Sequence, residues 1–159
     1  MPAADVGNEG GVAGGATRSE SVRNGLAAVP NDASIICVHD AARPFATADL
    51  YATVVGAVIA GADCAVPGIL VTDTIKVVDK AGRVVSTPDR VTLRAVQTPQ
   101  AFRSTVLRAA HASAAEGTDD AALVEAMGGM VVVVAGSEDN RKITYPEDLE
   151  WARSKVGVA

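Results

Sequence analysis

The apolar run Ile35-Ile36-Cys37-Val38 is followed at once by the charged hexapeptide His39-Asp40-Ala41-Ala42-Arg43-Pro44. Four consecutive apolar residues predict a strand covered on both faces, as in the sheets of α/β proteins. An acid and a guanidinium at the end of such a strand must be paired or face water. Ligands of open α/β sheets also bind at this edge. The segment alone therefore leaves two interpretations open, a turn locked by Asp40 and Arg43 or part of a binding site.

Helix-like and strand-like segments alternate along the chain, which is typical of an α/β fold with a parallel sheet and crossover helices. Thr47 is expected to cap one helix and Gly61 to end it. A capping box of Thr144 and Glu147 is expected to start the last helix. The other expected helices are 21–29, 104–115 and 119–127, and the expected strands are 34–38, 62–66, 93–97 and 130–135, the last buried on both faces.

Two β-rich runs, 74–78 and 83–87, flank the turn-like Asp79-Lys80-Ala81-Gly82 and predict a β-hairpin. A two-stranded hairpin is marginally stable by itself in water, so this one needs another surface to pack on. Thr98-Pro99 is expected to end the strand 93–97, because proline has no amide hydrogen for a strand ladder.

Composition limits the classes of protein to which the chain can belong. Its 159 residues are enough for one domain with a core, and a hydrophobic content of 48% excludes general disorder. A net charge of −5 argues against nucleic-acid binding. We expect no membrane partner and a cytoplasmic protein, since no apolar stretch reaches the roughly 18 residues of a membrane span. Cys37 and Cys64 are expected to be free thiols.

Five further segments follow one another in an order typical of a single enzyme family. Together with the hexapeptide, this ordered set resembles the IspD family, the CTP-using 2-C-methyl-D-erythritol 4-phosphate cytidylyltransferases of non-mevalonate isoprenoid biosynthesis. The resemblance covers about residues 14–152. The segments are Gly14–Val22, Thr72–Lys76, Val96–Phe102, Thr118–Ala121 and Asn140–Leu149.

The resemblance implies an α/β fold with a Rossmann-like nucleotidyltransferase sheet and a projecting β-arm at about 72–92, which embraces a second subunit in a homodimer. Family members open with a strand and a glycine-rich basic loop that wraps the CTP triphosphate, and nothing here matches it. We therefore interpret 1–13 as a flexible leader and 14–159 as a partial, N-terminally truncated nucleotidyltransferase domain. Two explanations stay open, a misplaced gene start and a natural fragment. In either case we expect little transferase activity from the chain alone.

The implied reaction is the attack of a phosphate monoester on the α-phosphorus of CTP, with release of pyrophosphate. Such a monoester is already an anion near neutral pH, because its second pKa is about 6. No general base is needed, so positioning and charge compensation should dominate catalysis. Cations and hydroxyls should therefore matter more than His39, expected to be a structural residue at the strand end, or His111, expected to be a solvated helix residue.

By resemblance, the catalytic residues are Lys142, between the CTP phosphates and the acceptor phosphate, and Arg90, which reaches across the dimer to the incoming phosphate. A solvated lysine and a surface pair of Asp89 with Arg90 are the structural alternatives. The substrate-binding positions are Arg43, Thr74, Thr98 and Thr118, the last with a helix cap as its alternative.

The resemblance assigns nucleotide binding to Gly15 and Ser21 at the cytosine base and to Asp40 and Ala41 at the ribose. Mg²⁺ is the expected cofactor, carried mainly by CTP, and Asp40 is a candidate to help place it. Ala16 stands where some relatives have Asp.

Two other functions stay open at this point. Pentitol-phosphate cytidylyltransferases share the sheet and the Thr-Pro-Gln motif at 98–100, although Ala41-Ala42 and the segment Thr72–Lys76 favour methylerythritol phosphate as acceptor. A non-catalytic binding or dimerisation module is the second alternative, supported by the missing glycine-rich loop.

Overall fold

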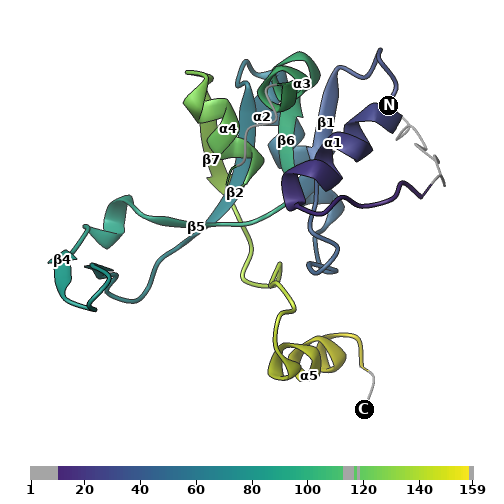
Figure 1. Cartoon of the computed structure of the whole chain (residues 1–159). Helices are drawn as coiled ribbons and strands as arrows, with labels where there is room; N and C mark the ends of the chain where they lie inside the picture. Colours follow the sequence, from purple (N-terminus) through teal and green to yellow (C-terminus); the bar gives the residue numbers. More distant parts are fainter. Residues whose placement is uncertain (1–10, 113–116, 118, 158–159) are drawn as a thin grey trace.

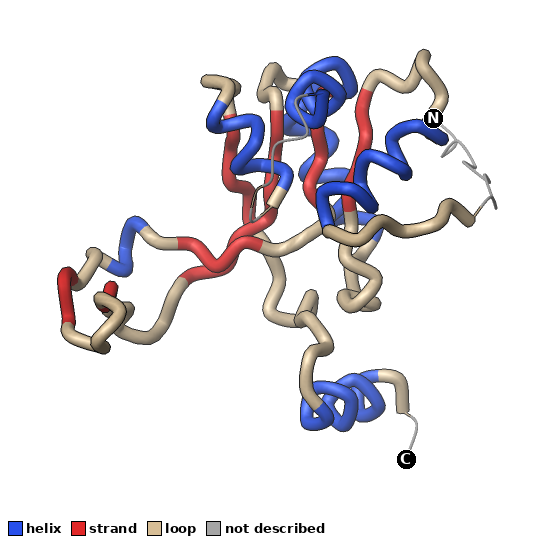
Figure 2. The backbone as a smooth tube through the Cα atoms, in the orientation of Figure 1, coloured by secondary structure: helices blue, strands red, loops and turns tan. Residues whose placement is uncertain are grey.

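The computed structural model describes residues 11–112, 117 and 119–157 (Figure 1). The first ten residues of the expected leader and the site candidate Thr118 lie outside the described residues. A central sheet has helices on both faces, a β-hairpin arm projects from one end of it, and the last helix lies apart from the sheet (Figure 1, Figure 2). The chain is therefore α/β, as predicted.

The sheet is mixed rather than parallel, which corrects the sequence-based expectation. β1 (Ile35–Val38) and β2 (Cys64–Leu70) are both antiparallel to β6 (Gln100–Arg103), which lies between them. β7 (Val131–Ala135) is parallel to β2. The strand β6 was not predicted, because its four residues Gln-Ala-Phe-Arg carry too little apolar sequence to indicate a strand.

β5 (Arg94–Val96) and β6 run along the same edge of β2, since β7 occupies the other edge. The Gln97 amide still donates to the Pro67 carbonyl of β2 at 2.7 Å, and the pairing is interrupted at Thr98 and Pro99, where the peptide bond is cis. Thr98-Pro99 thus ends β5 as predicted, but the chain continues along β2. The side chains of Gln97 and Thr98 make contacts with the segments that follow β7 and β1.

Alternate residues of the strands build two apolar layers. Cys64, Val66 and Phe102 pack toward α1 (Arg18–Ala28), α3 (Ser104–Ala112) and α4 (Asp120–Ala126). Ala65 and Ala101 pack against α2 (Ala48–Ile59) on the opposite face. This alternation follows from the two-residue period of a strand.

Caps at the helix starts explain where the helices begin. Thr47 accepts a hydrogen bond from the Leu50 amide and caps α2, as predicted. Thr17 caps α1, which therefore begins earlier than the expected 21–29. Asp119 caps α4 through the Ala122 amide at 2.8 Å.

The predicted capping box of the last helix is displaced by one residue. α5 (Pro146–Lys155) begins at Pro146, so Tyr145 is the N-cap and Asp148 stands at the third helical position. The Asp148 carboxylate accepts hydrogen bonds from the Thr144 and Tyr145 amides, both at 3.0 Å. Glu147 therefore stands at the second helical position, because proline occupies the first and sets the register.

β7 is an edge strand among the described residues, and the predicted burial of both its faces is wrong. It pairs with β2 alone within this part of the chain, and Val133 is 49% exposed. Cys37 and Cys64 are free thiols, as predicted, and burial raises the pKa of the Cys64 thiol to about 12.

The predicted hairpin is present, with strands shorter than expected. β3 (Val77–Val78) pairs with β4 (Val84–Ser86), and Gly82 adopts the positive φ of +78° that this turn requires. A short 3₁₀ helix, η1 (Arg90–Thr92), follows on the way back to β5. None of the described helices is both long and apolar enough to cross a membrane.

Candidate functional site

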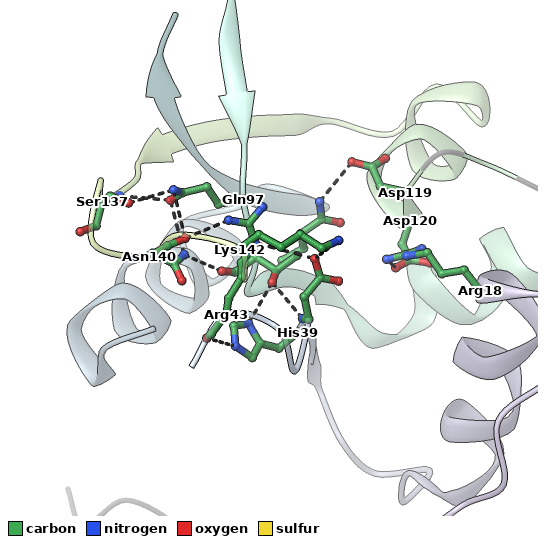
Figure 3. Close-up of polar contacts among 12 residues, drawn as sticks. Arg18, His39, Arg43, Gln97, Asp119, Asp120, Ser137, Asn140 and Lys142 are labelled. Atoms are coloured by element: carbon green, nitrogen blue, oxygen red, sulfur yellow. Dashed lines mark hydrogen bonds and ion pairs between the residues drawn. The ribbon is translucent and has the colours of Figure 1, made fainter. Parts of the chain in front are cut away.

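The turn after β1 is held by its own backbone and by Thr98 (Figure 3). The Arg43 amide donates to the Asp40 carbonyl at 2.9 Å, which closes the turn around Ala41. The Asp40 amide donates to Thr98 Oγ1 at 2.9 Å. His39 contacts Thr98 Oγ1 through Nδ1 at 2.9 Å and the Arg43 carbonyl through Nε2 at 3.0 Å. The predicted structural role of His39 is therefore confirmed.

Lys142 and Arg43, which lie side by side in Figure 3, both contact the Asp40 carboxylate. Lys142 Nζ lies 3.2 Å from Asp40 Oδ2, and Arg43 Nε lies 3.7 Å from the same oxygen. Arg43 also donates from Nη1 to the Asn140 carbonyl at 2.8 Å. Burial lowers the pKa of Arg43, and Asp40 opposes that shift. Two cations thus meet at one carboxylate, and the acids Asp119, Glu138 and Asp139 line the cavities around them.

Lys142 and Arg43 border two cavities at once. The first, of about 360 Å³, is lined by Thr98, Gln100 and Asp119 together with these two cations, Asp40 and Arg18. The second, of about 440 Å³, extends from the same two cations to Trp151 on α5 and Ile69 on β2. The two cations are therefore shared by both cavities.

Gly15 and Ser21 lie together at the start of α1. The Gly15 amide donates to Ser21 Oγ at 2.9 Å, and a Cβ at Gly15 would lie 2.5 Å from the Cβ of Glu20. Ser21 and Asp40 both line a third cavity of about 380 Å³ between α1 and β1. The structure therefore brings the two predicted base-contacting residues to the same side of β1 as Asp40.

Thr74 and Arg90 lie on the arm, away from the other predicted residues. Both are exposed, and Arg90 donates from Nη1 to the Thr72 carbonyl at 2.8 Å. Asp89 accepts from the Val91 amide at 3.1 Å and caps η1, and no described ion pair joins it to Arg90. Within one chain, then, Lys142, Arg43, Thr98, Asp40 and Ala41 come together, whereas the two arm residues do not.

Sequence reasoning missed a buried charged cluster beside this site. Asp120 is fully buried and contacts Arg18 Nη2 at 2.7 Å and His111 Nε2 at 2.9 Å. His111 is 4% exposed, so the predicted solvated histidine is wrong. The hydrogen bond to Asp120 raises the pKa of Arg18. The adjacent acids Asp119 and Asp120 were a signal of this cluster in the sequence. Only one of them can cap the helix, so the other needs a different partner.

Two buried amides were also missed as site residues. Gln97 is 4% exposed and Asn140 is fully buried. Gln97 Nε2 donates to the Asn140 carbonyl, and Asn140 Nδ2 donates to the Thr98 carbonyl, beside Lys142 (Figure 3). A buried primary amide needs several hydrogen-bond partners. Two such amides close together therefore indicate a buried polar network rather than a surface loop.

Comparisons with known proteins agree with this arrangement. The family described as IspD, 2-C-methyl-D-erythritol 4-phosphate cytidylyltransferase, matches residues 10–157. A protein of that name from Nocardia farcinica is 52% identical over 143 residues, which cover 90% of this chain and 62% of the relative. The chain thus spans less than two thirds of the length of that relative.

Solved structures show the same likeness. The 4-diphosphocytidyl-2C-methyl-D-erythritol synthase of Anaerococcus prevotii superposes with a TM-score of 0.84 at 31% identity, covering 91% of this chain and 68% of the other. The cytidylyltransferase of Thermus thermophilus gives a TM-score of 0.80 at 39% identity, with coverage of 91% and 72%. Sequence and fold therefore agree, and the chain belongs to the 2-C-methyl-D-erythritol 4-phosphate cytidylyltransferase family.

Proposed function

We propose that this chain carries the acceptor side and part of the nucleotide side of a site that transfers a cytidylyl group from CTP to 2-C-methyl-D-erythritol 4-phosphate. The observation that supports this most is the position of Lys142 and Arg43 on the border of two cavities. Both cations would then lie between the nucleotide and the acceptor. The relatives that carry this name support the identity of both substrates.

The acceptor phosphate is the nucleophile, and no residue has to remove a proton from it at neutral pH. Two anions must approach one another, so the barrier depends on how well positive charge is placed between them. We assign this role to Lys142. Its side chain is half exposed, and its ammonium group, 3.2 Å from Asp40, would be available to phosphate oxygens. Arg43 and Thr98 would orient the acceptor.

On the nucleotide side, Asp40 and Ala41 would contact the ribose, while Gly15 and Ser21 would contact the cytosine base. Thr118 would offer its hydroxyl to the acceptor. Mg²⁺ would arrive with CTP, since it prefers phosphate oxygens, carboxylates and water as ligands. Asp40 and Asp119 are carboxylates that line the first cavity, and Asp40 is our candidate to help place the ion.

We propose a homodimer in which the arm of each chain completes the site of its partner. Ile75, Val77, Val78, Val84 and Val85 of the arm are all at least 40% exposed. Thr74 and Arg90 lie on the same arm, remote from Lys142 of their own chain. Arm exchange would bury the apolar residues and would bring Arg90 to the acceptor phosphate of the partner.

The experiment is a chimera in which this chain replaces the part of the Nocardia farcinica relative that it matches, assayed with CTP, Mg²⁺ and 2-C-methyl-D-erythritol 4-phosphate. We expect pyrophosphate release and a cytidine diphosphate product. Lys142→Ala should lower kcat by about 10² to 10³-fold, the usual cost of losing one oriented charge donor. Turnover of ribitol phosphate, with none of methylerythritol phosphate, would instead establish the pentitol-phosphate alternative. A folded chimera without turnover of either acceptor would favour a binding or dimerisation module.

A further inference from the structure

The side-chain amide of Gln97 pairs with the backbone of Ser137 as one strand pairs with another (Figure 3). Gln97 Nε2 donates to the Ser137 carbonyl at 2.8 Å, and Gln97 Oε1 accepts from the Ser137 amide at 3.1 Å. Both backbone groups of one residue are therefore satisfied by one buried side chain. This pairing begins where the β2–β7 ladder ends, since β7 stops at Ala135 and the Gly136 amide still donates to the Gly68 carbonyl at 3.0 Å.

Asn140 extends the pairing toward the charged residues. Its Nδ2 donates to the Thr98 carbonyl at 2.7 Å, and its own carbonyl accepts from Gln97 Nε2 at 3.3 Å and from Arg43 Nη1 at 2.8 Å. At the far end of the loop, the Ile143 amide donates to the Ala42 carbonyl at 2.8 Å. Lys142 is thus held between two anchored positions, one at Asn140 and one at Ile143.

Gly136 provides the space that the Gln97 amide occupies. A Cβ at Gly136 would lie 2.7 Å from Gln97 Oε1 and 3.1 Å from the backbone of Gly68. Atoms do not approach so closely, so any side chain at Gly136 would displace the amide or the strand. The Gln97 pairing therefore depends on a glycine that has no contact with the cavity itself.

We propose that Gln97 is a positioning residue, which acts through Ser137 and Asn140 to hold Lys142 against Asp40 and Arg43. The catalytic consequence of this inference rests on the proposed function, whereas the positioning itself does not. A small displacement of a reacting charge can lower a rate by about 10²-fold, so a fixed loop matters as much as the lysine it carries.

The first test is hydrogen exchange of the Ser137 and Ile143 amides in the 159-residue chain. Gln97→Glu keeps the shape of the side chain but replaces the Nε2 donor by an oxygen that faces the Ser137 carbonyl. Gly136→Ala displaces the amide without changing its chemistry. We expect both variants to raise the exchange rate of the two amides at least tenfold. The matched controls are Asn31→Asp, which adds the same charge in an exposed turn, and Gly56→Ala, which places a methyl group in open space on α2.

The second test is a double-mutant cycle in the chimera. Gln97→Glu should lower kcat at least tenfold by itself and should have no further effect once Lys142 is alanine, because it acts through that lysine. A merely structural role would give additive losses, and that result would overturn the inference. Unchanged exchange in Gln97→Glu would overturn it as well. An inactive parent chimera would contradict the proposed function instead, while the exchange experiment would still decide whether Gln97 holds the loop.

Discussion

At the scale of single residues, carboxylates determine most of the polar geometry around the site. Asp120 joins α1, α3 and α4 through Arg18 and His111, whereas Asp40 gathers the cations of the two cavities. Asp148 holds the start of α5 and also contacts Arg141 at 2.8 Å. Each carboxylate has backbone or charged partners, which lowers the free energy of placing it in a buried or partly buried position.

Asp120→Asn should destabilise the protein by about 2 kcal/mol or more, because it removes the charge that Arg18 and His111 share. The loss stays below the full value for a buried ion pair, since the Arg18 side chain is 38% exposed. Urea unfolding measures the difference. Asp32→Asn, at an exposed turn, is the control and should leave the midpoint unchanged. A loss below about 0.5 kcal/mol for Asp120→Asn would mean that this pairing adds nothing to stability.

Acid should loosen α5 through Asp148. Hydrogen bonds from the Tyr145 and Thr144 amides, together with the charge of Arg141, lower the pKa of this carboxyl. A lowered folded pKa gives stability that is complete above the unfolded value of about 3.9 and is lost as the pH falls through the folded pKa. Trp151, the single tryptophan, lies on α5 and reports its packing by fluorescence. Asp148→Asn should weaken α5 at pH 7 and flatten this change below about pH 4. An unchanged acid transition in the variant would exclude Asp148 as its source.

At the scale of elements, the arm and α5 differ from the rest of the fold because each has few apolar contacts within the chain. α5 is joined to the body through the edge-to-face contact of Trp151 with Phe45, whose ring centroids are 5.3 Å apart. The arm is a hairpin of two short strands with exposed valines. A second chain could cover these valines, whereas this chain leaves them exposed.

Deleting 78–84 should convert the proposed dimer into monomers, since it removes the turn and the paired residues Val78 and Val84, without which the hairpin cannot form. Light scattering measures the mass directly. Val85→Glu, at a side chain that is 66% exposed, should weaken association without removing the hairpin. The same mass before and after the deletion would show that the arm does not mediate assembly.

At the scale of the whole molecule, stability depends on the two apolar layers on either side of one sheet. Phe102 is fully buried at the centre of β6 and pairs with both Ile36 and Cys64 across the strands. The strand that sequence analysis did not predict therefore carries the largest core side chain of the sheet.

Phe102→Ala should cost about 3–5 kcal/mol, the usual price of a large cavity in a core. This is a large share of the stability of a typical domain, about 5–15 kcal/mol. Thermal unfolding followed by circular dichroism should show one transition at a much lower temperature. Phe45→Ala is the matched control, because Phe45 is only partly buried and should mainly alter the Trp151 signal. Equal losses in the two variants would contradict the central place of β6.

Local sequence predicted the elements whose signals lie within a few neighbouring residues. The β1 strand with its charged turn, the Thr47 cap of α2 and the hairpin around Gly82 all depend on such short-range patterns. The candidate residues Lys142, Arg43, Asp40 and Thr98 were found from motifs, and the structure brings these four together. Their roles came from the resemblance to the family, since the residues taken alone left structural alternatives open.

Tertiary structure decided the features that depend on residues distant in the chain. β6 is a strand because β1 and β2 offer it two edges, and His111 is buried because α4 places Asp120 beside it. Gln97 reaches Ser137, 40 residues away, only because β5 and β7 flank the same strand. The free energies of burial and of hydrogen bonding of a residue depend on such distant neighbours. A local sequence pattern does not identify these neighbours.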